Sequence, residues 1–219
     1  MKRVKYPRTP HMPNSPGATS DDVKLKSLAH FMRKKCVFSE KLDGENTTLY
    51  RDHIHARSVD GRHHPSRSWV KQLHSSIAHM IPKGWRVCGE NMYAKHSIYY
   101  DNLPSYFFVF SVWNDKDFCL GWNEMIEWCN LVGLETVPSQ EFYFSESSQL
   151  ECNGTSAFDI WTDENKVEPT VREGVVIRTR NGFAFDDFQS HIAKYVRANH
   201  VQTDEHWMHS TVIPNGLAT

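Results

Sequence analysis

A lysine flanked by acidic side chains is the feature of this chain with the clearest chemical use. Residues 40–46 read Glu-Lys-Leu-Asp-Gly-Glu-Asn and place Lys41 three positions before Gly44. A neutral lysine amine is a nucleophile, but with an ordinary pKa of ~10.4 only roughly one in 2,500 is neutral at pH 7. A nearby cation would raise that fraction, and a glycine would let a ligand approach the backbone closely. The same run also fits a charged surface turn, so its meaning depends on partners elsewhere in the chain.

Five later segments carry the charged and aromatic side chains that such a nucleophile would need. A phosphoryl group needs fixed cations and Mg²⁺ needs oxygen ligands, whereas an adenine ring needs a flat apolar face. Each candidate also has an ordinary structural explanation, as a core ring, a strand-start carboxylate or a solvated charge. The candidates are Arg57 in residues 55–58, Glu90 in residues 88–93, Phe110 in residues 107–111, Glu173 in residues 172–178 and Lys194 in residues 193–197.

Taken in chain order, these segments resemble the motifs of the covalent nucleotidyltransferases, which include DNA ligases, RNA ligases and mRNA capping enzymes. Residues 40–46 are similar to motif I (K-x-D/H-G-x-N/R), residues 88–93 to motif III (G-E-x-x-Y) and residues 172–178 to motif IV (E-G-x-V-I/K). Asn46 stands where DNA ligases and capping enzymes usually have arginine and where nick-sealing RNA ligases have asparagine. The resemblance, which runs over residues 37–197, therefore implies an ATP-dependent RNA ligase.

The segment similar to motif V departs from the family pattern. The family usually has two lysines separated by one residue, whereas here Lys194 is followed by Tyr195, Val196 and Arg197. Strand alternation predicts that Val196 shares a face with Lys194. Either Lys194 acts alone, or a local bulge brings Arg197 round to the same face.

The resemblance also implies a role for each candidate residue. Lys41 would take AMP from ATP, Lys194 would contact the phosphates, and Glu173 would hold Mg²⁺ or Mn²⁺. Other residues are expected to bind the rest of the nucleotide: Glu40 toward the base and away from the Lys41 amine, Gly44 and Asn46 within motif I, Arg57 at the ribose or phosphate, Glu90 at the ribose hydroxyls and Phe110 stacked on adenine.

The implied reaction joins a 3′-hydroxyl and a 5′-phosphate of RNA, with AMP passing from ATP to Lys41, then to the 5′-phosphate, and leaving when the 3′-hydroxyl attacks. Other functions stay open: a small DNA ligase, a capping-type guanylyltransferase, or a non-catalytic domain that binds a nucleotide or an RNA end. A metal-binding protein is a further alternative, because four histidines lie close together in the sequence, although they form no closed set of zinc ligands. These histidines are His53, His55, His63 and His64.

The composition describes an ordinary globular protein. Hydrophobic residues make up 39% and charged residues 23% of the 219 residues, and the net charge of −1 excludes a wholly basic nucleic-acid-binding protein. No run approaches the ~20 apolar residues of a membrane span, and the proline-rich start of the chain lacks the apolar core of a secretory signal. Five singly spaced cysteines predict buried thiols in a reducing compartment and hence a cytoplasmic location.

The pattern of elements predicts an α+β fold with mostly antiparallel sheets flanked by helices, which the resemblance specifies as a nucleotidyltransferase (ATP-grasp-like) domain. Residues 1–19 are expected to form a flexible or loosely docked arm and residues 20–219 a single domain without a separate C-terminal OB-fold, whose place a partner protein could take. Helices are predicted over residues 20–35, 66–81 and 122–132, strands over 47–50, 53–55, 85–90, 106–113, 175–179 and 193–196, and a polar surface excursion over 145–170.

Overall fold

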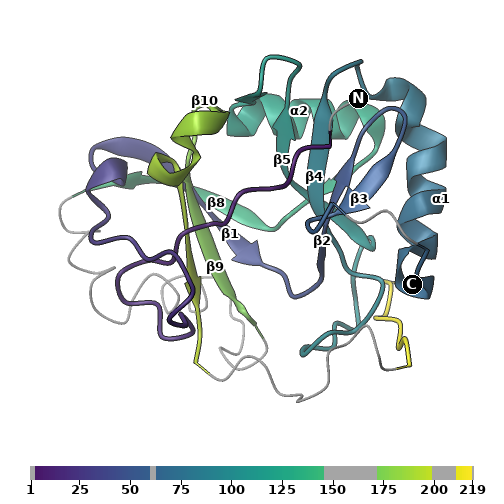
Figure 1. The fold of residues 1–219 in the computed structure, drawn as a ribbon, viewed down its shortest axis with the longest axis horizontal. Coiled ribbons are helices and arrows are strands. Elements are labelled where there is room, and N and C mark those ends of the chain that lie inside the picture. Colours follow the sequence, from purple (N-terminus) through teal and green to yellow (C-terminus); the bar gives the residue numbers. More distant parts are fainter. Residues whose placement is uncertain (1–2, 60–62, 146–171, 199–210, 219) are drawn as a thin grey trace. The chain divides into compact units, whose positions relative to one another are not determined.

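The chain forms two compact units in a computed structural model. The structure describes residues 3–59, 63–145, 172–198 and 211–218 (Figure 1). Unit 1 consists of Met1–Tyr6, Asp43–Val137 and Gln202–Thr219, and unit 2 consists of Pro7–Leu42 and Pro138–Val201. The sequence predicts one domain from residue 20 onward, whereas the contacts divide the chain at residues 42 and 43, inside the motif I run. Each unit is therefore described by itself.

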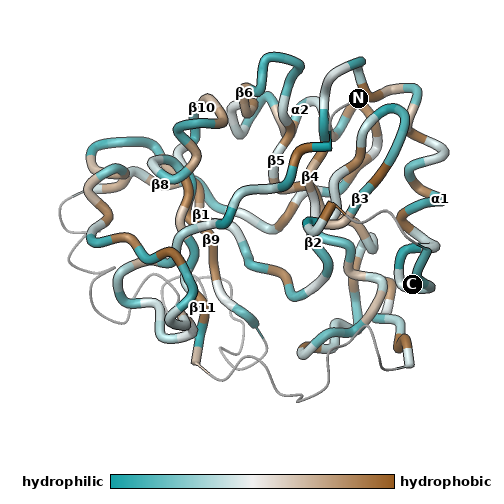
Figure 2. The backbone as a smooth tube through the Cα atoms, in the orientation of Figure 1, coloured by the Kyte–Doolittle hydropathy of each residue, from teal (hydrophilic) through white to brown (hydrophobic). Residues whose placement is uncertain are grey.

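Unit 1 is built on a mostly antiparallel sheet of short strands. Its strands follow the order β6-β5-β4-β2-β3, and β7 pairs with β5 in parallel. Hydrophobic residues dominate β5, as the sequence predicts for a buried strand (Figure 2). The strand bounds are Glu45–Leu49 (β2), Ile54–Ala56 (β3), Arg86–Asn91 (β4), Phe107–Trp113 (β5), Phe118–Cys119 (β6) and Glu135–Thr136 (β7).

The described residues of this unit form two α-helices, and both are predicted by the sequence. Helix α1 spans Ser68–Ile77 between 3₁₀ turns η2 (Pro65–Arg67) and η3 (Ala78–Met80). Helix α2 spans Trp122–Val132 and ends at Gly133, whose φ of 72° is the left-handed conformation that glycine adopts easily. The spacing of Trp69, Leu73, Ile77 and Met80 predicts one apolar face for the helix over residues 66–81, which is wrong at Met80, since this residue is 43% exposed. The tighter winding of η3 rotates that side chain off the face that Ile77 buries.

Unit 2 is built on a four-stranded antiparallel sheet in the order β11-β9-β1-β8. The predicted strands over residues 175–179 and 193–196 are confirmed, whereas β1 and β8 are not predicted. The predicted surface excursion at 145–170 lies outside the described residues except for residue 145. The element bounds are Ala29–Phe31 (η1), Lys34–Lys41 (β1), Ser139–Phe144 (β8), Gly174–Thr179 (β9), Phe183–Ala184 (β10), Phe185–Ser190 (η5) and Ile192–Val196 (β11).

The first residues of unit 2 pack into its core instead of forming the flexible arm expected over residues 1–19. Met12 is fully buried in the same cluster as Leu28 and Phe31. The Met12 amide donates to the Lys194 carbonyl at 2.7 Å, and the Lys194 amide donates to the Pro10 carbonyl at 2.8 Å. These bonds extend the sheet beyond β11, so the segment is an integral part of the unit.

The predicted helix over residues 20–35 is also wrong. Only the short turn η1 forms there, and β1 already begins at Lys34. The His11 amide donates to the Val23 carbonyl, and the Leu25 amide donates to the His11 carbonyl. These backbone groups would be needed inside a helix, so pairing with the preceding segment prevents it. The helical spacing of Leu25, Leu28, Phe31 and Met32 underlies the prediction; in the structure Leu28 and Phe31 are buried, and the partly buried Leu25 and Met32 pack against the same cluster.

Candidate active site

Strand register in unit 2 brings Lys41 and Lys194 to the same face of the sheet. Lys41 lies opposite Gly174 of β9, whereas Lys194 of β11 lies opposite Val176. Directly opposed residues of an antiparallel pair share a face, and so do alternate residues along a strand. The two lysine Cα atoms are therefore separated by two strand spacings and a two-residue offset, or roughly 12 Å. That distance is within the combined reach of two lysine side chains.

Gly174 is a residue of this face that the candidate set did not include. A Cβ atom at this position would overlap the carbonyl oxygen of Tyr195. Only glycine fits between the strands that carry Lys41 and Lys194, which gives a packing reason for the glycine of the motif IV pattern.

Lys41 forms an ion pair with Glu173. The Lys41 Nζ and Glu173 Oε2 atoms are 2.6 Å apart, and the two side chains are 24% and 9% exposed. Such a pair holds the lysine as an ammonium ion, whereas a nucleophilic lysine must lose its proton. The sequence predicts that a neighbouring cation activates Lys41. In the structure the neighbour is Glu173, the carboxylate that is the candidate metal ligand.

Glu40 takes no part in this ion pair. It follows the alternation of β1 onto the opposite face, where its Oε2 atom accepts a hydrogen bond from Arg172 at 2.6 Å. Burial raises the pKa of Glu40, and the Arg172 charge opposes that rise. Arg172 is a site residue that the sequence analysis missed, although it directly precedes the motif IV glutamate.

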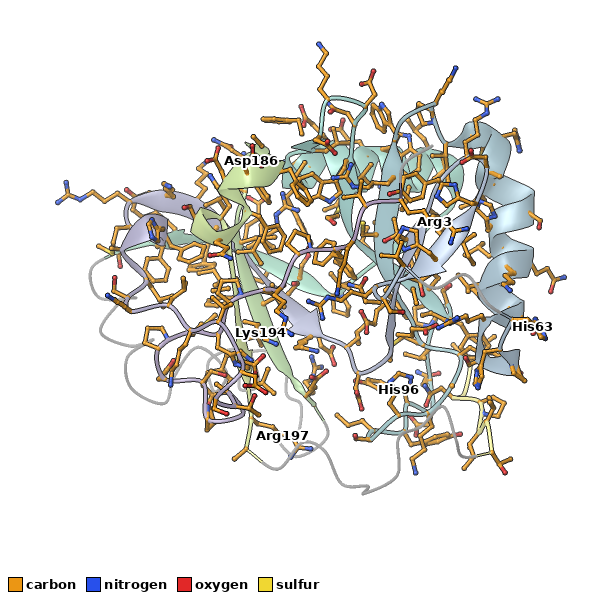
Figure 3. All side chains as sticks on the ribbon, viewed as in Figure 1. Arg3, His63, His96, Asp186, Lys194 and Arg197 are labelled. Atoms are coloured by element: carbon orange, nitrogen blue, oxygen red, sulfur yellow. The ribbon has the colours of Figure 1, made fainter. Side chains whose placement is uncertain are left out.

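Arg197 supports the backbone around Glu173. Its amide donates to the Glu173 carbonyl at 3.0 Å, and its Nε atom donates to the Arg172 carbonyl at 2.6 Å. Val196 is buried on the face that register assigns to Lys194. Arg197 and Lys194 are both labelled in Figure 3. The altered motif V thus supplies one lysine on the shared face and an arginine that holds the start of motif IV.

A buried histidine lies beside these charges. His11 is 1% exposed, its Nδ1 atom is 2.8 Å from Ser15 Oγ, and its Nε2 atom is 3.5 Å from Asp22 Oδ2. Burial lowers the pKa of His11 from 6.5 to about 4, and the positive charges of Lys194 and Lys41 add to that effect. His11 is therefore neutral at pH 7 in the folded chain.

The low pKa of His11 predicts a loss of stability in acid. The unfolded chain binds a proton at His11 below pH 6.5, whereas the folded chain does so only near pH 4. Folding is therefore opposed progressively as the pH falls from 6.5 toward 4. We expect a weaker loss of melting temperature over this window for His11→Gln than for the wild type. His30→Gln, which alters an exposed histidine of the same unit, should follow the wild type; equal pH profiles for all three proteins would contradict the prediction.

Unit 1 places Asn46 and Glu90 directly opposite each other on strands β2 and β4. Each is the only residue of its strand that is not fully buried. Within the described part of the chain, the Asn46 Oδ1 atom is buried and has no hydrogen-bond partner. A buried amide oxygen left in this state is available to a donor on a ligand. The Arg57 amide donates to the Asn46 carbonyl at 2.9 Å, so Arg57 also lies at this strand pair.

Phe110 lies at a β-bulge and is partly buried. Cys88 of β4 lies opposite Ser111, but the next residue, Gly89, lies opposite Val109, so β5 holds one extra residue, Phe110. It is also the only residue of β5 that is not fully buried. A bulge redirects a side chain that regular alternation would place differently, which is consistent with a ring available for stacking.

Tyr6 is an aromatic neighbour of Phe110 that the sequence analysis did not single out. The two rings are 5.1 Å apart in an edge-to-face arrangement, and the Tyr6 carbonyl accepts a hydrogen bond from Arg57 Nε at 3.3 Å. Gly44 packs against the end of β4, where a Cβ atom would lie 2.6 Å from the Asn91 oxygen. Tyr6 and Gly44 thus each have a packing role within unit 1.

The histidine-rich segment shows local hydrogen bonds. His53 Nδ1 lies 2.7 Å from Asp52 Oδ1, His55 Nδ1 lies 2.7 Å from the Ala56 carbonyl, and His64 Nδ1 lies 2.7 Å from Ser66 Oγ. Among the residues that the structure describes, no three metal-ligand side chains form a cluster.

Two further features follow from the described residues. The four cysteines in these parts of the chain are buried thiols, as the sequence predicts; they are Cys36, Cys88, Cys119 and Cys129. In the same parts, every helix is too short or too polar to cross a membrane.

The sequence matches the family model for RNA ligase over residues 34–196, which is well over half of the chain. The chain belongs to the RNA ligase family. This places it in the covalent nucleotidyltransferase superfamily, with the mixed α and β fold and antiparallel sheets that the sequence predicts. No curated protein matches the sequence.

Solved structures of other ligases share the fold of this RNA ligase family member. An archaeal ATP-dependent RNA ligase matches with a TM-score of 0.56 and 16% identity, over 88% of this chain and 48% of its own. A Naegleria gruberi RNA ligase variant with ATP and Mn matches with a TM-score of 0.52 and 14% identity, over 90% and 62%. An Aquifex aeolicus protein described as an ATP-dependent DNA ligase matches with a TM-score of 0.50 and 20% identity, over 78% and 46%. The chain spans about half the length of such ligases, and at these identities the likeness shows the fold alone.

Proposed function

We propose that this chain carries out the nucleotidyl-transfer chemistry of an ATP-dependent RNA ligase that joins a 3′-hydroxyl to a 5′-phosphate through AMP bound to Lys41. The observation that carries the proposal is the Lys41–Glu173 ion pair at 2.6 Å, on the sheet face that also bears Lys194. A reactive amine, a carboxylate and a second cation are what attack on a phosphate requires. Membership of the RNA ligase family supports RNA as the substrate.

The reaction has three steps, of which the first two transfer AMP and the third releases it. In the first step the neutral Lys41 amine attacks the α-phosphorus of ATP, a P–N bond forms, the amine nitrogen releases a proton, and pyrophosphate leaves as the P–O bond to the β-phosphate breaks. In the second step an oxygen of the RNA 5′-phosphate attacks the same phosphorus, the P–N bond breaks, and the amine regains a proton. In the third step the 3′-hydroxyl attacks the 5′-phosphate, loses its proton and displaces AMP.

We propose separate roles for the residues that handle charge. Lys194 neutralises the phosphate oxygens, where negative charge develops during attack. Glu173 is the carboxylate that would hold Mg²⁺ or Mn²⁺, and a single protein ligand fits Mg²⁺ because this ion keeps several waters and also binds substrate phosphates. The metal would supply positive charge at the phosphates. A Glu173 side chain turned toward a metal would also leave the Lys41 ion pair, which removes the contact that favours the ammonium form.

The adenosine part of ATP is assigned to other side chains. Phe110, the partly buried residue at the bulge, would stack on adenine, and Glu90 would accept hydrogen bonds from the ribose hydroxyls. The unpartnered Asn46 oxygen would accept another hydrogen bond from the nucleotide. Arg57 would reach the ribose or a phosphate, Glu40 would face the base, and Gly44 would permit close approach of the ligand.

The test is a sealing assay with matched nicked duplexes. One substrate carries the nick between RNA strands and the other between DNA strands, each with a 3′-hydroxyl and a 5′-phosphate, and ATP, GTP and no nucleotide are compared. We expect joined product with ATP and the RNA nick. Preferential joining of the DNA nick would reassign the chain to the DNA ligases, and covalent labelling by GTP in place of ATP would reassign it to the capping enzymes. Tight ATP binding without any covalent adduct would show a non-catalytic domain.

A further inference from the structure

The backbone of residues 211–218 forms hydrogen bonds along the loop that joins β4 to β5 in unit 1. The Lys95 amide donates to the Ile213 carbonyl at 2.7 Å, the Gly216 amide donates to the Tyr100 carbonyl at 2.7 Å, and the Leu103 amide donates to the Gly216 carbonyl at 2.9 Å. The backbones approach so closely that a Cβ atom on Gly216 would lie 2.6 Å from the Asp101 oxygen. The loop includes His96, which is labelled in Figure 3.

Asn215 is the centre of this attachment. It is 3% exposed, its Nδ2 atom donates to the Met92 carbonyl at 2.7 Å, and its Oδ1 atom accepts from the Tyr100 amide at 3.0 Å. Its backbone amide donates to the Tyr93 carbonyl at 2.9 Å, and its carbonyl accepts from the Tyr106 hydroxyl at 2.7 Å. The Asn215 side chain therefore joins the start and the middle of the loop, and its backbone carbonyl binds the end.

The same loop holds Asp43 of the motif I run. Asp43 Oδ2 accepts hydrogen bonds from the amides of Ser97 at 2.8 Å and of Ile98 at 2.9 Å. The Asp43 amide in turn donates to the Tyr100 hydroxyl at 3.2 Å. Asp43 comes two residues after Lys41 and directly before Gly44, so the loop conformation sets where the motif I turn begins.

We infer that Asn215 is a positioning residue for nucleotidyl transfer, which acts by holding the loop over residues 93–106 in the conformation that anchors Asp43. The inference rests on the proposed function of Lys41. Tyr100 is the connecting residue, because Asn215 binds its amide and Asp43 binds its hydroxyl. A carboxylate that accepts hydrogen bonds from two backbone amides is held in position only while both amides stay in position.

The test compares Asn215→Ala with a matched asparagine variant, Asn114→Ala. Asn114 also accepts two backbone hydrogen bonds in unit 1, from Lys116 and Phe118, but at a turn with no bond to Asp43. Hydrogen exchange at the Ser97 and Ile98 amides reports the loop, and the rate of AMP transfer to the protein at saturating ATP reports chemistry. We expect Asn215→Ala to speed exchange at both amides and to slow AMP transfer by about tenfold or more, because small misplacements of reacting groups have effects of that size. Asn114→Ala should leave both measurements unchanged.

Two further variants decide between positioning and general destabilisation. Combining Asn215→Ala with Asp43→Ala should slow AMP transfer by less than the product of the single effects, since both changes act through one contact. Tyr100→Phe removes only the hydroxyl between the loop and Asp43, so it tests the same path if Asn215→Ala does not fold. Unchanged exchange and unchanged AMP transfer in a folded Asn215→Ala or Tyr100→Phe protein would overturn the inference. If the wild type forms no AMP adduct, the proposed function has failed, while the exchange experiment still decides whether Asn215 holds the loop.

Discussion

Lys41→Ala is expected to abolish covalent labelling of the protein by ATP that carries radioactive phosphorus at its α-phosphate. After reaction with this ATP and Mg²⁺, the wild type should keep the label when it is denatured, because the AMP is attached through a P–N bond to Lys41. No other side chain can replace an amine that has been removed from the position of attack. Lys41→Arg should fail as well, because a guanidinium keeps the positive charge but stays protonated.

A lysine on the same strand provides the control for this result. Lys35 is exposed on β1, six residues before Lys41, and Lys35→Ala should label like the wild type. The comparison separates loss of the nucleophile from a general effect on the strand. Full labelling of Lys41→Ala would contradict the assignment of Lys41, whatever the sealing assay shows.

Arg67→Ala is expected to destabilise the folded chain by about 3–5 kcal/mol, because it leaves the buried Glu45 carboxylate without its ionic partner. The Arg67 Nε atom lies 3.0 Å and 2.8 Å from the two Glu45 carboxylate oxygens, and a further bond joins its Nη2 atom to Oε1. The two side chains are only 5% and 9% exposed. This pair ties β2 to the 3₁₀ turn that precedes α1. Urea unfolding gives the free energy to be compared.

An exposed ion pair is the matched control. Arg180 Nε lies 2.8 Å from Glu141 Oε1, but the two side chains are 30% and 44% exposed. Arg180→Ala should change the free energy of unfolding by less than about 1 kcal/mol, because solvent screens a surface pair. Equal effects of Arg67→Ala and Arg180→Ala would show that burial does not decide the strength of the Glu45 pair.

Features encoded in short stretches of chain could be predicted from the sequence. The hairpin of β2 and β3, the helices α1 and α2 and the strand β5 have local apolar patterns and turn residues, and the structure confirms them. The order of the motifs that begin at Lys41 likewise indicated the RNA ligase family, which the family model confirms. Local patterns also mislead: the residues from Leu25 to Met32 have helical spacing, but pairing with the segment around His11, which this spacing does not reveal, overrides it.

The tertiary structure decided which distant residues meet. The Lys41–Glu173 pair joins residues that are 132 positions apart, and the shared face of Lys41 and Lys194 depends on the register of three strands. The bulge at Phe110 and the contacts of Asn215 likewise cannot be inferred from any single segment. The physical reason is that hydrophobic periodicity indicates which face of a helix or strand is buried. Register, bulges and long-range hydrogen bonds are set instead by the partner strand or loop. A shift of one residue in strand register would move every side chain of that strand to the opposite face of the sheet.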